Sequence, residues 1–340
     1  MGSVKDLMVI EKPTENEPGI GRFVFSDRYS VFDWGEMPDH ISKKGQAICI
    51  ATAYYFEKLA EGGIKSHYLG VVEEGRAKRL QELKSPSNTM EIKLLRVIKP
   101  ELKGNNYDYS IYKKETRNFL IPLEIIYRNA LPVGSSVFKR LKEGVLKPSD
   151  IGLDRIPEPG QILEKPIYDV STKLEITDRY LTWEEAKEIC VLSDEELNEM
   201  KRIVAYINDL ITKETQRLGL FNEDGKIELG FDEKRNFMLV DAVGTLDECR
   251  FTFDGIAVSK EIARIFYRQT EWFKEVEEAK KKDRVNWKSV VKSQPPKLPP
   301  ELFETISQIY QAYTNDLTGR RWFDVPPLQQ ILVKIKNLAL

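Results

Sequence analysis

The sequence has few cysteines and histidines, and their scarcity excludes several kinds of site. Its three cysteines, Cys49, Cys190 and Cys249, are widely spaced and form no C-x-x-C pair. That spacing predicts neither a disulfide framework nor a zinc site, and it suits a reducing cell interior. The two histidines, His40 and His67, are too few for a histidine-rich metal centre.

Net charge and long apolar runs are equally scarce. The formal net charge is −2, so we expect no strong field for polyanions and no nucleic-acid partner. No apolar run reaches membrane-spanning length, and charged residues interrupt the N-terminal stretch, so we expect no signal peptide there. We expect a cytoplasmic protein with no membrane partner. Its 340 residues, 41% of them hydrophobic, are enough for two domains with ordinary cores.

Residues 219–251 carry acids and bases where a core strand would carry none. Between residues 226 and 231, charged or small residues alternate with apolar ones. This period of two predicts a strand with one packed face and one open face. Residues 232–235 then predict a turn, and residues 237–243 predict a returning strand.

A tightly closed hairpin would place Lys226 opposite Asp241, with Glu228 diagonal to it, on the open face. Leu239 then also lies on the open face, whereas the packed face takes Met238, Val240 and Ala242. A carboxylate pair is typical of a Mg²⁺ site, because this ion completes its shell with phosphate oxygens and water. On this pattern alone, a solvated face with a cross-strand ion pair is the simpler interpretation.

The same two strands resemble the paired signature of the SAICAR synthetases (phosphoribosylaminoimidazole-succinocarboxamide synthases), D-x-K-x-E-F-G followed by D-E-x-x-T-P-D-S-S-R. The matching positions are Asp224, Lys226, Glu228, Gly230, Asp241, Thr245, Asp247 and Arg250. The chain departs from the signature at Ala242, Leu246, Glu248 and Cys249.

Four further stretches resemble the family in family order. The N-terminus is similar to a G-K-x-K/R loop over the ATP phosphates, with Ser3 replacing the first lysine and matches at Gly2, Val4 and Lys5. Residues 23–33 resemble T-D-R-I-S-A-F-D, with matches at Asp27, Arg28, Ser30 and Asp33. Residues 119–141 resemble V-P-V-E-x-V-V-R-N followed by G-S, with matches at Pro122, Glu124, Arg128, Asn129, Gly134 and Ser135. Residues 165–186 resemble P-x-F-x-x-S-T-K-x-E-x-x-H-D, with Thr177 replacing the histidine and matches at Ser171, Thr172, Lys173, Glu175 and Asp178.

Two of these stretches also have a structural interpretation. Asp27 and Arg28 fit an aspartate-capped turn with an arginine salt bridge. Arg128, at the end of a predicted buried strand, fits a phosphate site, because a guanidinium group can donate two parallel hydrogen bonds to phosphate oxygens. It fits an ion pair with Glu124 equally well.

The resemblance implies an ATP-dependent ligase that joins L-aspartate to carboxyaminoimidazole ribotide in de novo purine biosynthesis, through an acyl phosphate. It implies Mg²⁺ as cofactor and leaves a homo-oligomer open. The residues it implies are, as catalytic groups, Lys226, Asp224 and Lys173; for ATP, Gly2, Val4, Lys5 and Glu124; for substrates, Asp27, Arg28, Ser30, Arg128, Ser135 and Arg250; and for the metal, Glu228 and Asp241.

The implied fold is α+β and related to ATP-grasp enzymes, with antiparallel sheets, a nucleotide cleft and two domains at 1–118 and 119–340. Residues 99–118 read as an inserted hairpin whose tyrosines pack or shield the adenine, and the helical pattern of 320–340 packs or mediates assembly. Two alternatives remain open. One is a related ligase or kinase for another small substrate, and the other is a silent nucleotide-binding paralogue.

Overall fold

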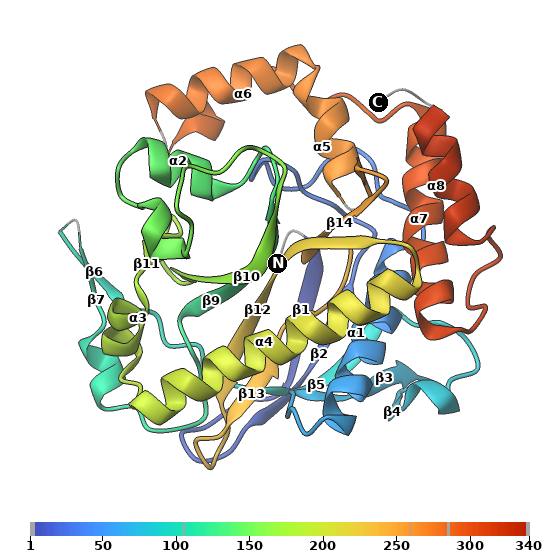
Figure 1. Cartoon of the computed structure of the whole chain (residues 1–340). Coiled ribbons are helices and arrows are strands. Elements are labelled where there is room, and N and C mark those ends of the chain that lie inside the picture. Colours follow the sequence, from blue (N-terminus) through green and yellow to red (C-terminus); the bar gives the residue numbers. More distant parts are fainter. Residues whose placement is uncertain (1–3, 105, 259, 284–285, 338–340) are drawn as a thin grey trace.

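The structure is a computed structural model of the chain, and it describes residues 4–104, 106–258, 260–283 and 286–337. Two antiparallel sheets organise it (Figure 1). The first has strand order β1-β2-β5-β3-β4, with bounds β1 Lys5–Glu11, β2 Gly19–Phe25, β5 Thr89–Leu94, β3 Tyr68–Glu73 and β4 Arg76–Lys78. The second runs β11-β10-β9-β12-β14-β15, with bounds β11 Tyr180–Leu181, β10 Gln161–Thr172, β9 Leu123–Leu131, β12 Phe221–Phe231, β14 Cys249–Phe253 and β15 Ile256–Ala257. Two short strands also pair with β12, namely β8 Phe119–Leu120 and β13 Phe237–Val240.

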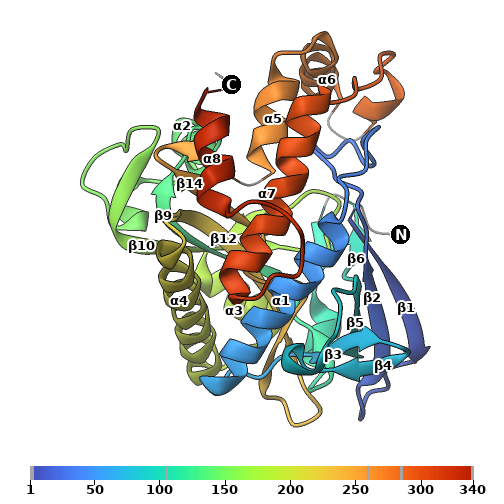
Figure 2. The same cartoon turned by 90° about the vertical axis from the view of Figure 1, so that its right-hand side faces the viewer.

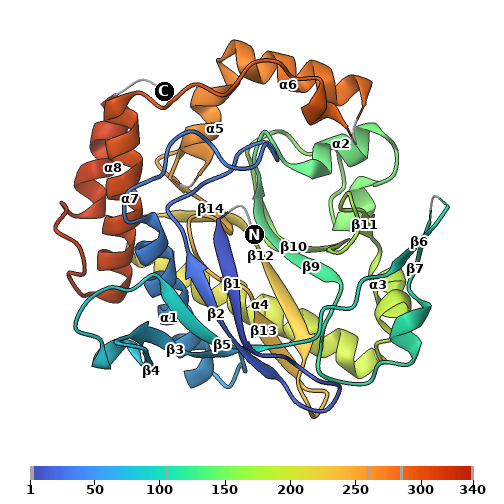
Figure 3. The ribbon, with the colours of Figure 1, turned by 180° about the vertical axis from the view of Figure 1, so that it is seen from behind.

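Helices pack against both of these sheets. Their bounds are α1 Lys44–Glu61, α2 Ser136–Lys142, α3 Trp183–Cys190, α4 Asp194–Arg217, α5 Glu261–Arg268, α6 Glu271–Lys282, α7 Pro300–Thr318 and α8 Leu328–Asn337. Figure 2 shows α4 on one side of β12 and the first sheet on the other, with α1 beside α7. Seen from behind in Figure 3, β1 and β2 lie over β12, so the inner face of the second sheet looks toward the first.

Local sequence signals explain where the helices that support β12 begin. Ser193 accepts the N–H of Glu196 at 3.1 Å and Glu196 accepts that of Ser193 at 2.9 Å, which caps α4. Thr182 and Glu185 make the same reciprocal pair at α3, as their spacing predicts. The buried side of α4 recurs every three or four residues and packs against β12 and β9; it consists of Leu197, Met200, Ile203, Val204, Ile207 and Ile211.

The predicted hairpin forms, but its predicted register is wrong. Glu228 pairs with Val240 and Leu229 with Leu239, so Lys226 does not lie opposite Asp241. The reason is the turn, which takes five residues because Asp232 accepts the N–H groups of residues 234 and 236 at 2.9 and 2.7 Å. A shift of one residue moves every side chain to the other face. Leu239 therefore lies in the main core, while Val240 and Met238 lie on the face of Glu228.

The remaining segments mostly follow the sequence. Residues 99–118 contain the expected hairpin, β6 Glu101–Lys103 paired with β7 Asn106–Asp108. Helices α5 and α6 are separate, because the side chain of Thr270 accepts the N–H of Phe273 at 3.2 Å and starts α6. The tail packs on α7 through Leu328, Ile331, Leu332 and Ile335 of α8. No helix within the described ranges is long and apolar enough to cross a membrane.

Candidate active site

One face of the second sheet carries two neighbouring groups of charged side chains. Asp224 of β12 pairs in register with Arg128 of β9 and with Arg250 of β14. Alternate residues of a strand share a face, so Lys226 and Glu228 follow Asp224 on the same side. Close packing behind this face needs Gly225, because a Cβ there would lie 2.4 Å from the hydroxyl of Tyr127. The strand thus connects two clusters along one row.

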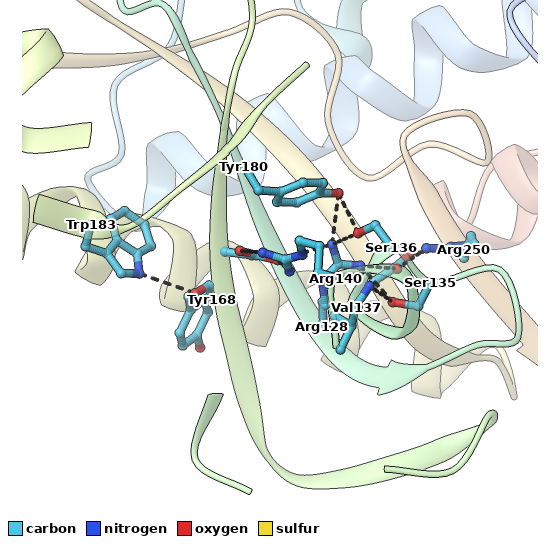
Figure 4. Close-up of polar contacts among 11 residues, drawn as sticks. Arg128, Ser135, Ser136, Val137, Arg140, Tyr168, Tyr180, Trp183 and Arg250 are labelled. Carbon is cyan, nitrogen blue, oxygen red and sulfur yellow. Dashed lines mark hydrogen bonds and ion pairs between the residues drawn. The ribbon is translucent and has the colours of Figure 1, made fainter. Parts of the chain in front are cut away.

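The first group, here called the arginine cluster, consists of Arg128, Arg140, Arg250, Asp169, Asp224, Ser135, Ser136 and Tyr180. Arg128 is at its centre, with 3% of its side chain exposed, and its Nη atoms lie 3.4 Å from Asp169 and 3.5 Å from Asp224. It also donates to Ser136 Oγ at 3.2 Å and to Tyr180 Oη at 3.3 Å, as the dashed contacts in Figure 4 show.

The other two guanidinium groups surround the same carboxylates. Arg250 Nε donates to Asp224 Oδ1 at 2.8 Å. Arg140 pairs with Asp169 and stacks over the ring of Tyr180 at 4.0 Å. Three guanidinium groups against two carboxylates leave one net positive charge, and the buried Nε atoms of Arg128 and Arg140 have no hydrogen-bond partner. Such a cluster suits an anion with several oxygens, such as a phosphate ester.

The second group, here called the lysine–carboxylate cluster, consists of Lys5, Lys173, Lys226, Glu124, Glu228, Asp241 and Glu248. Lys226 Nζ lies 2.8 Å from Glu124, 3.7 Å from Glu248 and 3.9 Å from Glu228. Lys173 contacts Glu228 and lies 3.6 Å from Glu124, and Lys5 contacts Asp241. The sequence left open an ion pair between Arg128 and Glu124. This pair does not form, because Glu124 contacts Lys226 and Lys173 instead.

Charge in this cluster is unevenly shared. Burial and the nearby charge of Asp241 raise the pKa of Glu228 to about 8. Although burial acts the other way, the ammonium of Lys5 holds the pKa of Asp241 below its usual range. Burial also opposes the charge on Lys226, yet the carboxylates of Glu248 and Glu124 raise its pKa. All three lysines have carboxylate partners. With Glu228 ionised, the four carboxylates exceed the three ammonium groups by one negative charge, whereas with Glu228 protonated, as its raised pKa favours at neutral pH, the charges balance.

The carboxylates of this cluster fit a Mg²⁺ ion. The charge of Asp241 raises the pKa of Glu228, so the two carboxyl groups lie near each other, and a cation bound between them would favour the ionised form of Glu228. No group of three or more His, Cys, Asp or Glu side chains suited to a metal occurs among the described residues. The carboxylate pair of Glu228 and Asp241 therefore suits an ion that takes one or two protein carboxylates and completes its shell with phosphate oxygens and water. It does not suit an ion held entirely by protein ligands.

The residues predicted after β2 lie in the loop between β2 and α1. Asp27 accepts the N–H groups of Lys43 at 3.2 Å and Gly45 at 2.9 Å, so it supports the start of α1. Arg28 donates to Asp6 at 2.9 Å. Ser30 accepts the N–H of residue 35 at 3.3 Å. This is the capped turn with an arginine salt bridge that the residues allowed, and a substrate role for the three stays a prediction.

The N-terminal predictions divide between described and undescribed residues. The carbonyl of Val4 accepts from the backbone N–H of Ser26 at 3.0 Å, which aligns the start of β1 and brings Lys5 to Asp241. Gly2, also expected at the ATP phosphates, lies outside the described residues, as does Ser3.

Sequence reasoning missed several members of the two clusters. Asp169 and Tyr180 flank the recognised run of residues 171–178, and alternation along β10 was a signal that could have added Asp169. Arg140 is one helical turn after Ser136 on α2, which places both on one side of that helix. Glu248 appeared only as a departure from the signature, although it contacts Lys226. Outside both clusters, sequence reasoning also missed a buried ion pair between Lys44 and Asp247 at 2.6 Å.

The fold and the charged clusters together define an α+β protein in which a cluster of arginines lies beside a carboxylate pair. The sequence model of the family described as SAICAR synthetase matches residues 2–284. A protein of Archaeoglobus fulgidus, whose name provisionally gives it as phosphoribosylaminoimidazole-succinocarboxamide synthase, is 54% identical over 338 residues, 99% of each chain. The synthase of that name from Thermoplasma acidophilum is 32% identical over 307 residues, covering 88% of this chain and 93% of its own.

This chain belongs to the SAICAR synthetase family and is a ligase. Solved structures confirm the α+β fold. The SAICAR synthase of Saccharomyces cerevisiae complexed with SAICAR has a TM-score of 0.64 at 20% identity, covering 95% of this chain and 94% of its own. A type-2 SAICAR synthetase in complex with ADP has a TM-score of 0.55 at 20% identity, covering 88% and 99%.

Proposed function

We propose that this ligase joins L-aspartate to the carboxylate of carboxyaminoimidazole ribotide, with conversion of ATP to ADP and phosphate, in de novo purine biosynthesis. The names of the relatives and the ADP and SAICAR complexes of the solved structures support this reaction. The observation that carries it is the joining of the two clusters by β12, which supplies Asp224 to one and Lys226 and Glu228 to the other.

The arginine cluster would hold the 5′-phosphate of the ribotide. Arg128 and Arg250 offer guanidinium groups, Ser135 offers a hydroxyl, and the excess positive charge favours a dianion. Asp224 would keep both arginines oriented, since it contacts each of them. The carboxylate end of the ribotide would then extend along the row toward Lys226.

The ATP phosphates would lie between β1 and β12, near Val4 and Lys5. Glu228 and Asp241 would hold Mg²⁺ there, and Glu124 would keep Lys226 in place. When bound, the ion would neutralise phosphate charge next to an anionic substrate. Lys5 and Lys173 contact these two carboxylates and would reorient toward phosphate or substrate oxygens as the ligands enter.

The chemistry would proceed in two displacements. A ribotide carboxylate oxygen attacks the γ-phosphorus, the bond to the β–γ bridging oxygen breaks, and ADP leaves with the bond pair. The amine of aspartate then attacks the acyl carbon, and phosphate leaves while the amine loses a proton. Lys173 and Lys226, which contact Glu228 and Glu124, would stabilise the anionic oxygens in both steps.

A covalent enzyme intermediate has no candidate nucleophile among the cysteines. All three thiols are buried, and burial raises the pKa of Cys49, Cys190 and Cys249. The phosphorylated carboxylate itself is the activated species, so positioning and charge stabilisation would suffice.

The proposal includes the two domains, at 1–118 and 119–340, with the ATP phosphates between them, and a homo-oligomer remains to be tested by light scattering. Family membership does not favour the alternatives of a kinase, a ligase for another substrate, or a silent paralogue. The test is ADP release by the purified protein with ATP, Mg²⁺, the ribotide and a panel of amino acids. Aspartate-dependent ADP and SAICAR formation is expected. ADP release with another acceptor only, or none at all, would overturn the proposal.

A further inference from the structure

Residues 99–118, here called the insertion, lie at the edge of the molecule beside α3 (Figures 1 and 3). Three tyrosines of the insertion, Tyr107, Tyr109 and Tyr112, each use the hydroxyl in a hydrogen bond. Tyr112 is fully buried and bonds to the carbonyl of Ile98, within its own part of the chain. The other two reach a different segment.

That segment, residues 173–179, is here called the Lys173 loop. Tyr109 Oη donates to Glu175 Oε1 at 2.7 Å, and the backbone N–H of Ile176 donates to Tyr107 Oη at 2.8 Å. Two consecutive loop residues are therefore bound by two tyrosines of the insertion. Glu175 is 6% exposed at its side chain, so this contact is shielded from water.

The Lys173 loop has little packing of its own. Ile176 is 72% exposed, and residues 177 and 178 are also exposed. Its base is closed by backbone and hydroxyl bonds between Thr172 and Arg179 at 2.9 and 3.0 Å. A loop with few buried contacts opens easily unless it is fixed elsewhere. The two tyrosine contacts provide that fixation at its middle.

Both ends of the loop reach the candidate active site. At one end Lys173 contacts Glu228 in the lysine–carboxylate cluster. Directly after the other end, the Tyr180 hydroxyl lies 2.7 Å from Ser136 Oγ and 3.3 Å from Arg128 Nη2 in the arginine cluster. A displacement of the loop would therefore move a member of each cluster.

We propose that Tyr107 and Tyr109 are positioning residues, which fix the Lys173 loop and thereby hold the ammonium of Lys173 against Glu228 and toward the substrate carboxylates. In this way the two tyrosines would act on the reaction through the Lys173 loop, without contacting either cluster themselves. This inference rests on the proposed function for its kinetic readout, but the fixation of the loop is a separate physical claim.

The test compares the double variant Tyr107→Phe/Tyr109→Phe with Tyr112→Phe, using the full chain. All three substitutions remove a hydroxyl from the same insertion, but only the double variant loses the bonds to the loop. We expect the double variant to lose kcat/KM for L-aspartate by ~10-fold, equivalent to about 1.4 kcal/mol, with ATP affinity unchanged within about twofold of the wild type. Tyr112→Phe should retain kcat/KM.

Hydrogen–deuterium exchange provides a readout that does not depend on activity. The amides of residues 175–178 should exchange faster in the double variant than in the wild type, and at the wild-type rate in Tyr112→Phe. The amides of α3 should stay protected in both variants. Unchanged exchange in the double variant, or equal kinetic loss in Tyr112→Phe, would overturn the inference. If the wild type forms no SAICAR, the proposed function fails, and the exchange experiment still decides whether the tyrosines fix the loop.

Discussion

Arg128→Ala should weaken binding of the ribotide while leaving ATP binding nearly intact. The Arg128 side chain is 3% exposed, and its guanidinium lies at the centre of the arginine cluster, within 3.5 Å of two carboxylates. A charge-assisted bidentate contact with a phosphate is worth about 1.5–3 kcal/mol. Its loss therefore corresponds to roughly 10- to 160-fold weaker ribotide binding.

The same substitution also acts on stability, and the structure limits that effect. Removing one partner of a buried ion pair costs about 3–5 kcal/mol when it leaves a charge uncompensated. Here Asp169 keeps Arg140 and Asp224 keeps Arg250, so we expect a smaller loss. Arg128→Lys keeps the charge but loses the forked geometry, and it should fall between the wild type and Arg128→Ala in ribotide affinity.

Calorimetric titration with each ligand, beside a thermal melt, is the assay. Arg202→Ala is the matched control. The Arg202 side chain is 62% exposed, and within the described residues its ion pair is with Glu199 on the same helix. Arg250→Ala should behave like Arg128→Ala. Equal loss of affinity for ribotide and ATP in a folded Arg128→Ala variant would remove this residue from the ribotide site.

Three other predictions follow from the lysine–carboxylate cluster. L-aspartate should be used far better than alanine or asparagine, by up to ~10⁴-fold in kcat/KM, because a missing carboxylate leaves cationic groups unpaired; comparable turnover of alanine would contradict the assignment. Glu228→Gln and Asp241→Asn should each abolish Mg²⁺-dependent ADP formation with an unchanged circular dichroism spectrum, and retained activity in both would make the hairpin structural. In the metal-free protein, the pKa of Glu228 is raised from about 4.3 to about 8, so the folded state holds an extra proton between those values and its free energy of unfolding falls as pH rises. Denaturant titrations from pH 5 to 8 should show that Glu228→Gln removes this fall, and parallel curves for the two proteins would refute it.

The sequence could predict those parts of the site that depend on local pattern. Alternation along residues 226–231 predicts a strand with Lys226 and Glu228 on one face, and both contact the same carboxylate–lysine network. The capping residues Thr182 and Ser193 predict where α3 and α4 begin. These features depend on neighbours in the chain, so a single sequence contains the information for them.

The pairing of strands could not be predicted in the same way. The register of the hairpin depends on how Asp232 folds the turn, and one extra turn residue changed the face of Leu239. The partners of Arg128 come from β10 and β12, which are 41 and 96 residues away along the chain. Nothing in the local pattern of residues 119–141 selects Asp169 and Asp224 over the nearer Glu124, because that choice depends on the order of strands in the sheet.

On the proposed function, the regular spacing of β12 would let this one strand serve both ends of an extended substrate. Asp224 and Glu228 are four residues apart on one face of β12, and at ~3.3 Å per residue they are separated by roughly 13 Å. A regular strand fixes this separation more firmly than two loops would, because its hydrogen bonds to β9 and β13 restrain it on both sides. On the proposed function, β12 would thus carry the metal carboxylate Glu228 and, through Asp224, orient Arg128 and Arg250 for the phosphate.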